Sequence, residues 1–309
     1  MAAPAASSAS LALSRLLAEV RSAVDARLPD LLAGDARLLD PQDALPSVTR
    51  EALLSPGKRV RPALVVLAGD LFEAPRSRLI DAGCAIEMVH AASLVLDDLP
   101  SMDDATLRRG RQALHVAHGE GNAILAAVTL LARAFGLLAE AGLHARRGGI
   151  PGSLALDLVS RLADASGLLG LASGQALDLA TDETGATFDR LETIHARKTG
   201  ALFVASAEFG AVLGGARQNE LSAVRSYARN VGLAFQIVDD LLEARGDARE
   251  TGKSARRVPA PTFVRHVGDA GARTLVAELT QHALESLKPF GKKAELLREF
   301  AVMLRDRKK

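Results

Sequence analysis

Residues 85–111 read AIEMVHAASLVLDDLPSMDDATLRRGR, an apolar run followed by four aspartates and three arginines. The apolar part, residues 85–96, is long enough to form a buried helix. The four carboxylates repel one another, so each would have a raised pKa unless cations neutralise it. Mg²⁺ suits this role because it prefers oxygen ligands and leaves coordination positions for substrate phosphates. The arginines favour the same interpretation, since guanidinium groups bind phosphate oxygens through paired hydrogen bonds.

Pro100 lies inside this acidic cluster. It biases Leu99 away from helical dihedrals, so the helix should end or distort within the motif. Such a break would let Asp97 and Asp103 reach one metal cluster, although they point in different directions on an ideal helix. The alternative is a solvated, charge-rich loop after a core helix. Carboxylates are unfavourable at a helix C-terminus, and this mismatch argues for function.

A second acidic cluster lies in AFQIVDDLLEARGD, residues 234–247. Asp239 and Glu243 are four residues apart and share a helix face, with Gln236 one turn earlier near the same face. A carboxylate face within an apolar helix is costly unless it is paired or binds metal. Two such clusters facing one cavity are how helical bundles build metal sites.

The composition is that of an ordinary globular protein, with 48% hydrophobic and 24% charged residues among 309. Lys and Arg (38) nearly balance Asp and Glu (37), so we expect no nucleic-acid partner. A single cysteine, Cys84, rules out an internal disulfide and favours a reducing, cytoplasmic location.

Neither a membrane span nor a secretory signal is expected. We find no apolar run long and charge-free enough to cross a bilayer, so we expect no stable membrane insertion. The first residues lack the basic stretch of a secretory signal, and we expect residues 1–9 to form a short disordered tail.

Helical periodicity dominates the chain, and no convincing alternating strand is found. We therefore predict an all-α protein, a single large helical bundle formed by one domain over residues 1–309. The expected helices cover residues 10–33, 47–54, 60–71, 77–97, 121–141, 152–180, 187–213, 218–246, 262–286 and 291–306.

Smaller basic and polar patterns accompany the acidic ones. In SPGKRVRP, residues 55–62, Lys and Arg side chains at a helix start form an anion site. In HARKTGALF, Lys198 and Thr199 lie beside Gly200, where a glycine is costly unless something approaches closely. His90 lies two turns before Asp97 on nearly the same face, and is either a core residue or a ligand.

Five motifs in order, GKRVRP, HAASLVLDDLPSMDDATLRRG, GQALDLA, KTGALF and FQIVDD, give the chain a family resemblance. The chain resembles the trans-isoprenyl diphosphate synthases, and most of all the bacterial short-chain enzymes that make farnesyl or geranylgeranyl diphosphate. The resemblance covers nearly the whole chain from about Leu53. It implies a helical bundle around a central cavity, two aspartate-rich motifs bridged by Mg²⁺, and a homodimer.

The resemblance also implies roles for individual residues. The metal ligands would come from both acidic motifs: Asp97, Asp98, Asp103, Asp239, Asp240 and Glu243. The allylic diphosphate would be held by Arg108, Lys198, Thr199, Gln236 and Lys253. Isopentenyl diphosphate would be held by Gly57, Lys58, Arg61, His90 and Arg109.

The implied chemistry needs no nucleophilic side chain. Mg²⁺ and cationic residues would stabilise the charge on departing pyrophosphate, leaving an allylic carbocation that the isopentenyl double bond attacks. Chain length would be set near the first motif by Met88, Ala92 and Ser93. Ala92 and Ser93 are small where farnesyl-producing relatives often carry an aromatic residue, so we expect geranylgeranyl diphosphate, with farnesyl diphosphate as runner-up.

Two departures from the family pattern keep other interpretations open. Glu243 stands where aspartate is usual, and the loop after Lys253 is shorter and lacks a further lysine. These changes motivate an alternative, a catalytically weakened paralogue that acts as a regulatory or binding subunit of a related synthase. A third interpretation, a class I terpene cyclase, is disfavoured by Lys58 and Arg61 and by the repeated DD in the second motif.

Overall fold

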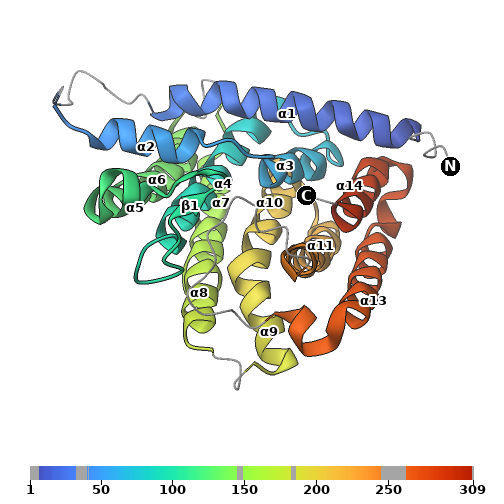
Figure 1. Cartoon of the computed structure of the whole chain (residues 1–309). Helices are drawn as coiled ribbons and strands as arrows, with labels where there is room; N and C mark the ends of the chain where they lie inside the picture. Colours follow the sequence, from blue (N-terminus) through green and yellow to red (C-terminus); the bar gives the residue numbers. More distant parts are fainter. Residues whose placement is uncertain are drawn as a thin grey trace.

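The computed structural model describes residues 7–32, 40, 42–144, 149–181, 186–244 and 262–307, which fold almost entirely into helices (Figure 1). The all-α prediction is confirmed. In chain order the helices are α1 (Ser8–Leu32), α2 (Leu45–Leu54), α3 (Val60–Asp70), α4 (Arg76–Asp97), α5 (Leu114–His118), α6 (Glu120–Leu143), α7 (Gly152–Ser166), α8 (Leu171–Leu179), α9 (Phe188–His195), the π-helix η3 (Ala196–Gly200), α10 (Ala201–Leu213), α11 (Gln218–Ala244), α13 (Phe263–Ser286), the 3₁₀-helix η4 (Lys288–Ala294) and α14 (Glu295–Asp306).

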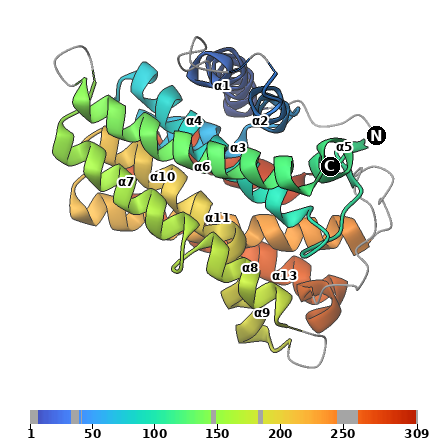
Figure 2. The ribbon, with the colours of Figure 1, turned by 90° about the vertical axis from the view of Figure 1, so that its left-hand side faces the viewer.

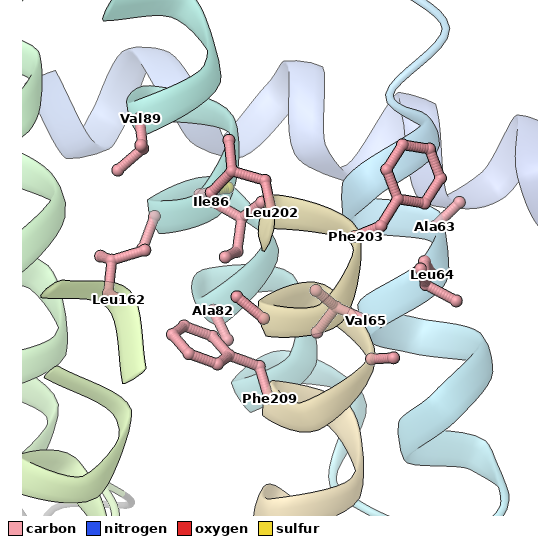
Figure 3. Packing of buried hydrophobic residues seen from close by; sticks show 14 of the residues in the cluster. Ala63, Leu64, Val65, Ala82, Ile86, Val89, Leu162, Leu202, Phe203 and Phe209 are labelled. Carbon is pink, nitrogen blue, oxygen red and sulfur yellow. The ribbon is translucent and has the colours of Figure 1, made fainter. Parts of the chain in front are cut away.

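The centre of the bundle is formed by α3, α4 and α10. Helix α10 packs against both of these helices and against α7 and α11. Figure 3 shows Phe203 of α10 facing α3, while Ile86 of α4 and Leu162 of α7 fill the space on its other side. Most α4 residues are buried, as expected for a helix that is apolar on all its faces.

The remaining helices cover this centre in layers. Helix α6 packs against α4 and α7. Helices α6 and α7 lie on the face turned to the viewer in Figure 2. Helix α1 runs across the end of the bundle against α3, α4 and α14 (Figure 1). It begins at Ser8, so the expected tail over residues 1–9 is wrong at its last two positions.

The helix predicted over residues 152–180 is two helices, α7 and α8, with a break between them. At the break, Gly167 (φ −94°, ψ −139°) and Gly170 (φ −133°, ψ −128°) have non-helical dihedrals. A Cβ at Gly170 would lie 2.0 Å from the Ala165 carbonyl oxygen, so the chain turns there at a position without a side chain. The glycine pair was visible in the sequence, but apolar periodicity on both sides masked it.

The structure also contains a two-stranded hairpin that the sequence analysis missed. Strand β1 (Leu107–Arg108) pairs antiparallel with β2 (Arg111–Gln112). The intervening Arg109 and Gly110 both have positive φ, 53° and 76°, as a type I′ turn requires. The hairpin reverses the chain direction just after the first acidic motif, so that Arg108 of β1 contacts Asp98.

Two helices, α4 and α6, are long and apolar enough to cross a membrane, contrary to our expectation that no segment would be. We expected no span because each long helix carries some charged side chains. In α6 these are Glu120, Arg133 and Glu140, and an 18-residue window of the helix contains at most two of them. In α4, 78% of the apolar window is buried inside the protein, as in the core helix of a soluble fold. In α6 only 39% is buried, which leaves an apolar face on the outside of the chain.

Candidate active site

The first acidic motif lies where α4 ends, and its loop folds back onto the helix. The Asp103 amide donates a hydrogen bond to the Asp97 carbonyl (2.9 Å), and the Ala105 amide donates to the Asp98 carbonyl (3.1 Å). The prediction that the helix would end within the motif, near Pro100, is thereby confirmed. Because of this reversal, Asp97 and Asp103 are neighbours despite their different directions on an ideal helix.

Asp97 lies in an electrostatically unfavourable environment. Burial raises the pKa of the Asp97 carboxyl to about 6; Lys198 opposes this shift, and the Asp103 carboxylate adds to it. Lys198 comes from η3, so the structure brings the first acidic motif and the KTG motif together. A buried carboxylate with a raised pKa gains most from a nearby cation.

Asp98 is paired within the protein. Its carboxylate accepts hydrogen bonds from the Arg108 guanidinium, including Nε at 2.9 Å, and both side chains are largely buried. The hairpin supplies this arginine. The pairing joins a predicted metal ligand to a predicted diphosphate ligand.

The second acidic motif lies on α11. Asp240 accepts hydrogen bonds from Gln236 Nε2 (3.0 Å) and from the Phe263 amide (3.2 Å). Burial nevertheless raises the pKa of Asp240 to about 7, and repulsion from Asp239 and Glu243 contributes. Glu243 itself is exposed near the end of α11.

Asp239 has a partner that the sequence analysis did not foresee. Arg307, which follows α14, lies 2.8 Å from Asp239 Oδ1 and also donates to the Phe235 carbonyl (2.7 Å). No local pattern marks Arg307, because its contacts depend on how α14 packs against α11.

The KTG motif forms η3, a π-helical turn between α9 and α10, and such turns are frequent at functional sites. Helix α8 packs directly on it: a Cβ at Gly174 would lie 2.2 Å from the Lys198 amide nitrogen. Lys198 Nζ contacts Asp178 Oδ2 at 2.8 Å. Thr199 donates to Gln236 Oε1 (2.8 Å), which links η3 to the second acidic motif through Gln236.

The basic turn before α3 lies near Asp239 of the second acidic motif. Burial and repulsion from Arg307 lower the pKa of Lys58, while Asp239 opposes the shift. Burial lowers the pKa of Arg61 to about 10, and its guanidinium lies over the Phe203 ring, 5.1 Å from the centroid. The basic turn before α3 and the second acidic motif on α11, which are distant in sequence, therefore interact electrostatically.

A cavity opens between α2, α4 and the hairpin. It is bordered by His90, Asp98, Arg108 and Arg109 together with Glu51, Ala52, Leu53, Ser55, Arg59, Glu87, Ala91, Leu94, Val95, Arg111, Gln112 and Leu114. Burial, with repulsion from the surrounding arginines, lowers the pKa of His90 well below its usual value. Four arginines and three carboxylates border the cavity, and Arg59 pairs with Glu87 and Arg108 with Asp98, so one positive charge is left in excess and favours an anion.

Arg109 closes one edge of this cavity against the basic turn. Its Nη1 donates to the Pro56 carbonyl (2.5 Å), and a Cβ at Gly57 would lie 3.0 Å from that nitrogen. Gly57 and Arg109, both expected to hold isopentenyl diphosphate, are therefore neighbours. Lys253 lies outside the described residues.

The three residues predicted to set chain length lie on α4 in the interior. Met88 and Ala92 are fully buried, and Ser93 is nearly so. The Ser93 hydroxyl donates to the His90 carbonyl (2.9 Å), so its polar group is satisfied within its own helix.

The carboxylates of the two motifs fit a divalent cation by their chemistry. The described part of the chain contains no group of three His, Cys, Asp or Glu side chains arranged to hold a metal. Asp98 and Asp239 instead face arginines. Asp97 is half-buried and Asp240 is buried, and the pKa of each carboxyl is raised, so a hard cation would stabilise the charged form of one carboxylate in each motif.

Comparisons with known proteins point to one protein family. Residues 42–257 match the family model of polyprenyl synthetase. The chain is 40% identical over 249 residues, 78% of this chain and 68% of the relative, to geranylgeranyl pyrophosphate synthase 11, chloroplastic, of Arabidopsis thaliana. An FPP/GFPP synthase from Zymomonas mobilis has a similar structure, with a TM-score of 0.83, 34% identity and coverage of 94% of this chain and 98% of that one.

A geranyltransferase from Legionella pneumophila is similar too, with a TM-score of 0.82, 32% identity and coverage of 96% and 98%. Sequence, fold and the ordered motifs therefore agree over nearly the whole chain. The chain belongs to the polyprenyl synthetase family.

Proposed function

We propose that this chain condenses isopentenyl diphosphate with an allylic diphosphate in a Mg²⁺-dependent reaction, and that its main product is geranylgeranyl diphosphate. Family membership makes it a trans-prenyltransferase. The observation that carries the metal-dependent site is the crowding of carboxylates in each acidic motif, where Asp97 lies beside Asp103 and Asp240 lies near Asp239 and Glu243.

The metal would be held by the carboxylates of both motifs, Asp97, Asp98, Asp103, Asp239, Asp240 and Glu243. When bound, Mg²⁺ supplies positive charge that stabilises the departing pyrophosphate. The ion pairs support this assignment, because each joins an acid to a cation that suits a diphosphate: Arg108 with Asp98, and Lys198 with Asp178. Binding of a metal diphosphate would free Asp98 for the metal and leave Arg108 and Lys198 to face phosphate oxygens.

The chain's own residues supply orientation and a dry environment. Thr199 and Gln236 hold η3 against the second motif, which keeps Lys198 near Asp97. The other diphosphate would be held by Lys58, Arg61, His90 and Arg109, of which His90 and Arg109 border the cavity. The neutral His90 favours donation of a hydrogen bond without adding charge.

Product length is proposed from the small residues one turn before the first motif. Ala92 is fully buried and carries only a methyl group, and Met88 lies one turn earlier in α4, further from the first acidic motif. A methyl group leaves room for a growing apolar chain, and each buried carbon contributes about 0.8 kcal/mol. The Arabidopsis relative is named a geranylgeranyl pyrophosphate synthase, which supports the same product here.

The test is incubation with isopentenyl diphosphate, each allylic primer in turn and Mg²⁺, followed by chain-length analysis of the products. We expect geranylgeranyl diphosphate, and we expect loss of product when a chelator removes the metal. A protein that binds the diphosphates but turns over none of them would contradict the proposal and favour the weakened-paralogue interpretation.

We also propose that two copies of the chain associate through the outer face of α6. Ile124, Leu125 and Val128 lie within about one turn of that helix and are 41–54% exposed. An apolar patch of this kind on a soluble protein marks an interaction surface. A second copy covers such a face symmetrically.

The dimer proposal is tested by light scattering of the purified protein. Leu125→Glu should convert a dimer into a monomer, because it places a charge in the apolar patch. Leu143→Glu is the matched control, since Leu143 ends α6 and is 82% exposed. A monomeric wild type, or a Leu125→Glu variant that stays dimeric, would contradict the proposal.

A cytoplasmic location remains a prediction.

A further inference from the structure

Arg59 has an unusual backbone conformation at the start of α3. Its dihedrals, φ 50° and ψ 41°, are in the left-handed region, which a residue with a side chain seldom adopts. It is also buried, with 5% of its surface exposed. A strained backbone and a buried charge persist only when their surroundings hold them in place.

Three parts of the protein hold the Arg59 side chain. Nε donates to Asp25 Oδ1 of α1 (2.8 Å), and Nη1 donates to Glu87 Oε1 of α4 (2.7 Å). Nη2 donates to the Ser55 carbonyl (3.3 Å) at the start of the basic turn. The guanidinium therefore fastens the turn to two long helices.

The residues on both sides of Arg59 are those assigned to isopentenyl diphosphate. Lys58 precedes it and Arg61 follows two positions later, and both interact electrostatically with Asp239. Gly57 lies close to it too, since a Cβ at Gly57 would be 3.4 Å from Arg59 Nη1. The left-handed bend thus lies between the two cations and sets their relative positions.

We propose that Arg59, through Glu87 and Asp25, is a positioning residue for the isopentenyl diphosphate site. The inference rests on the proposed function of that site. Arg59 borders the cavity, but we assign it a role through Lys58 and Arg61, because its side chain is only 4% exposed and each guanidinium nitrogen already donates to a protein acceptor. Glu87 is the buried anchor, and it keeps the guanidinium charged in a region crowded with arginines.

The test replaces Arg59 by lysine, which keeps the charge but cannot reach three acceptors with one planar fork. Arg59→Lys should raise the KM for isopentenyl diphosphate about tenfold or more while the KM for the allylic diphosphate stays within about twofold. Glu87→Gln should raise the same KM by a smaller factor. It also serves as the second variant if Arg59→Lys does not fold.

A closely matched control exists elsewhere in the bundle. Arg161 of α7 likewise pairs with one half-exposed carboxylate, Asp157, and one buried carboxylate, Glu208, which also pairs with Arg225. Arg161→Lys and Glu208→Gln should lower thermal stability to a similar extent as the Arg59 and Glu87 variants, with both KM values unchanged. The difference between the two sets isolates positioning from ordinary stabilisation.

Calorimetric binding of isopentenyl diphosphate, measured beside turnover, separates this inference from the proposed function. Weaker binding in Arg59→Lys than in the wild type supports positioning even if turnover is absent. If the wild type turns over but Arg59→Lys changes both KM values equally, or only kcat, the positioning role is wrong while the function stands. If the wild type does not bind isopentenyl diphosphate, both are wrong.

Discussion

Arg307 forms an ion pair with Asp239, with Nη2 2.8 Å from Oδ1. The Arg307 guanidinium carbon also lies 3.7 Å from the centroid of the Phe235 ring. The arginine is nearly buried, whereas the Asp239 side chain is 44% exposed. An internal cation thus occupies one carboxylate of the second acidic motif. Any metal bound by Asp239 has to compete with this guanidinium.

Removal of Arg307 should therefore make the acidic site more receptive to a metal. We expect Arg307→Ala to lower, by several-fold, the Mg²⁺ concentration that stabilises the protein in the presence of inorganic pyrophosphate. Loss of the ring contact should itself cost about 1 kcal/mol of stability without ligand. Arg305→Ala is the control, since among the described residues Arg305 pairs with the neighbouring Asp306 at the surface. Equal Mg²⁺ requirements in the two variants would contradict the competition.

Loss of either acidic motif should abolish most activity. Asp97→Ala and Asp239→Ala each remove an oxygen ligand from a site that stabilises leaving-group charge, which commonly costs on the order of 10²-fold in rate. Circular dichroism should show an intact fold. Asp269→Ala removes an exposed carboxylate paired with Arg273 and should leave the rate unchanged. Near-wild-type turnover in Asp97→Ala or Asp239→Ala would exclude the proposed metal role of that residue.

Glu243 tests how much the altered second motif matters. It lies near enough to Asp240 to contribute to the raised pKa of that carboxyl. Glu243→Asp should keep or raise activity, whereas Glu243→Ala should lower it or raise the Mg²⁺ requirement, because one negative charge is lost from the site. A metal titration of initial rates measures both effects. If neither variant differs from the wild type, Glu243 is a solvated surface carboxylate.

Because His195 is buried, we expect the free energy of unfolding to depend on pH, and this dependence can be measured without an activity assay. Burial lowers its pKa to about 4, and Nε2 has no hydrogen-bond partner among the described residues. The unfolded chain, with a pKa of about 6.5, binds the proton first. His195 therefore contributes stability that is fully present above pH 6.5 and is lost as the pH falls towards 4, by at most about 1.4 kcal/mol per pH unit.

His195→Phe should flatten this part of the stability curve, measured by denaturant unfolding between pH 4 and 7. Phenylalanine keeps a ring against Phe263, whose centroid lies 5.2 Å from that of His195. His266→Phe changes an exposed histidine and should leave the slope as in the wild type. An unchanged slope in His195→Phe would show that other groups cause the acid sensitivity.

Chain length should respond to volume on α4. Ala92→Tyr should shorten the product to farnesyl diphosphate because it fills space one turn before the first acidic motif. Met88→Ala should lengthen the product if Met88 is the floor, at a cost of about 2–5 kcal/mol in stability. Product analysis by mass spectrometry measures both. If the wild type already stops at farnesyl diphosphate, the argument from small residues is wrong.

Several features followed from the sequence because they depend on nearby residues. An apolar run ended by Pro100 was sufficient to predict a buried helix that stops at Asp97. Likewise, the spacing of Asp239 and Glu243 on one helix and the order of five motifs were enough to predict the helical fold and the family. Each of these depends on a local preference or on linear order, which the chain carries before it folds.

Tertiary structure alone decided which charges meet. The pairs Arg307–Asp239 and Lys198–Asp178, and the Arg59 contact with Glu87, each join elements distant in the chain. No local pattern specifies such partners, because a charged side chain is satisfied by any opposite charge that packing brings within reach. The break between α7 and α8 was missed for a related reason: its glycine pair becomes decisive only where backbone atoms meet at close range.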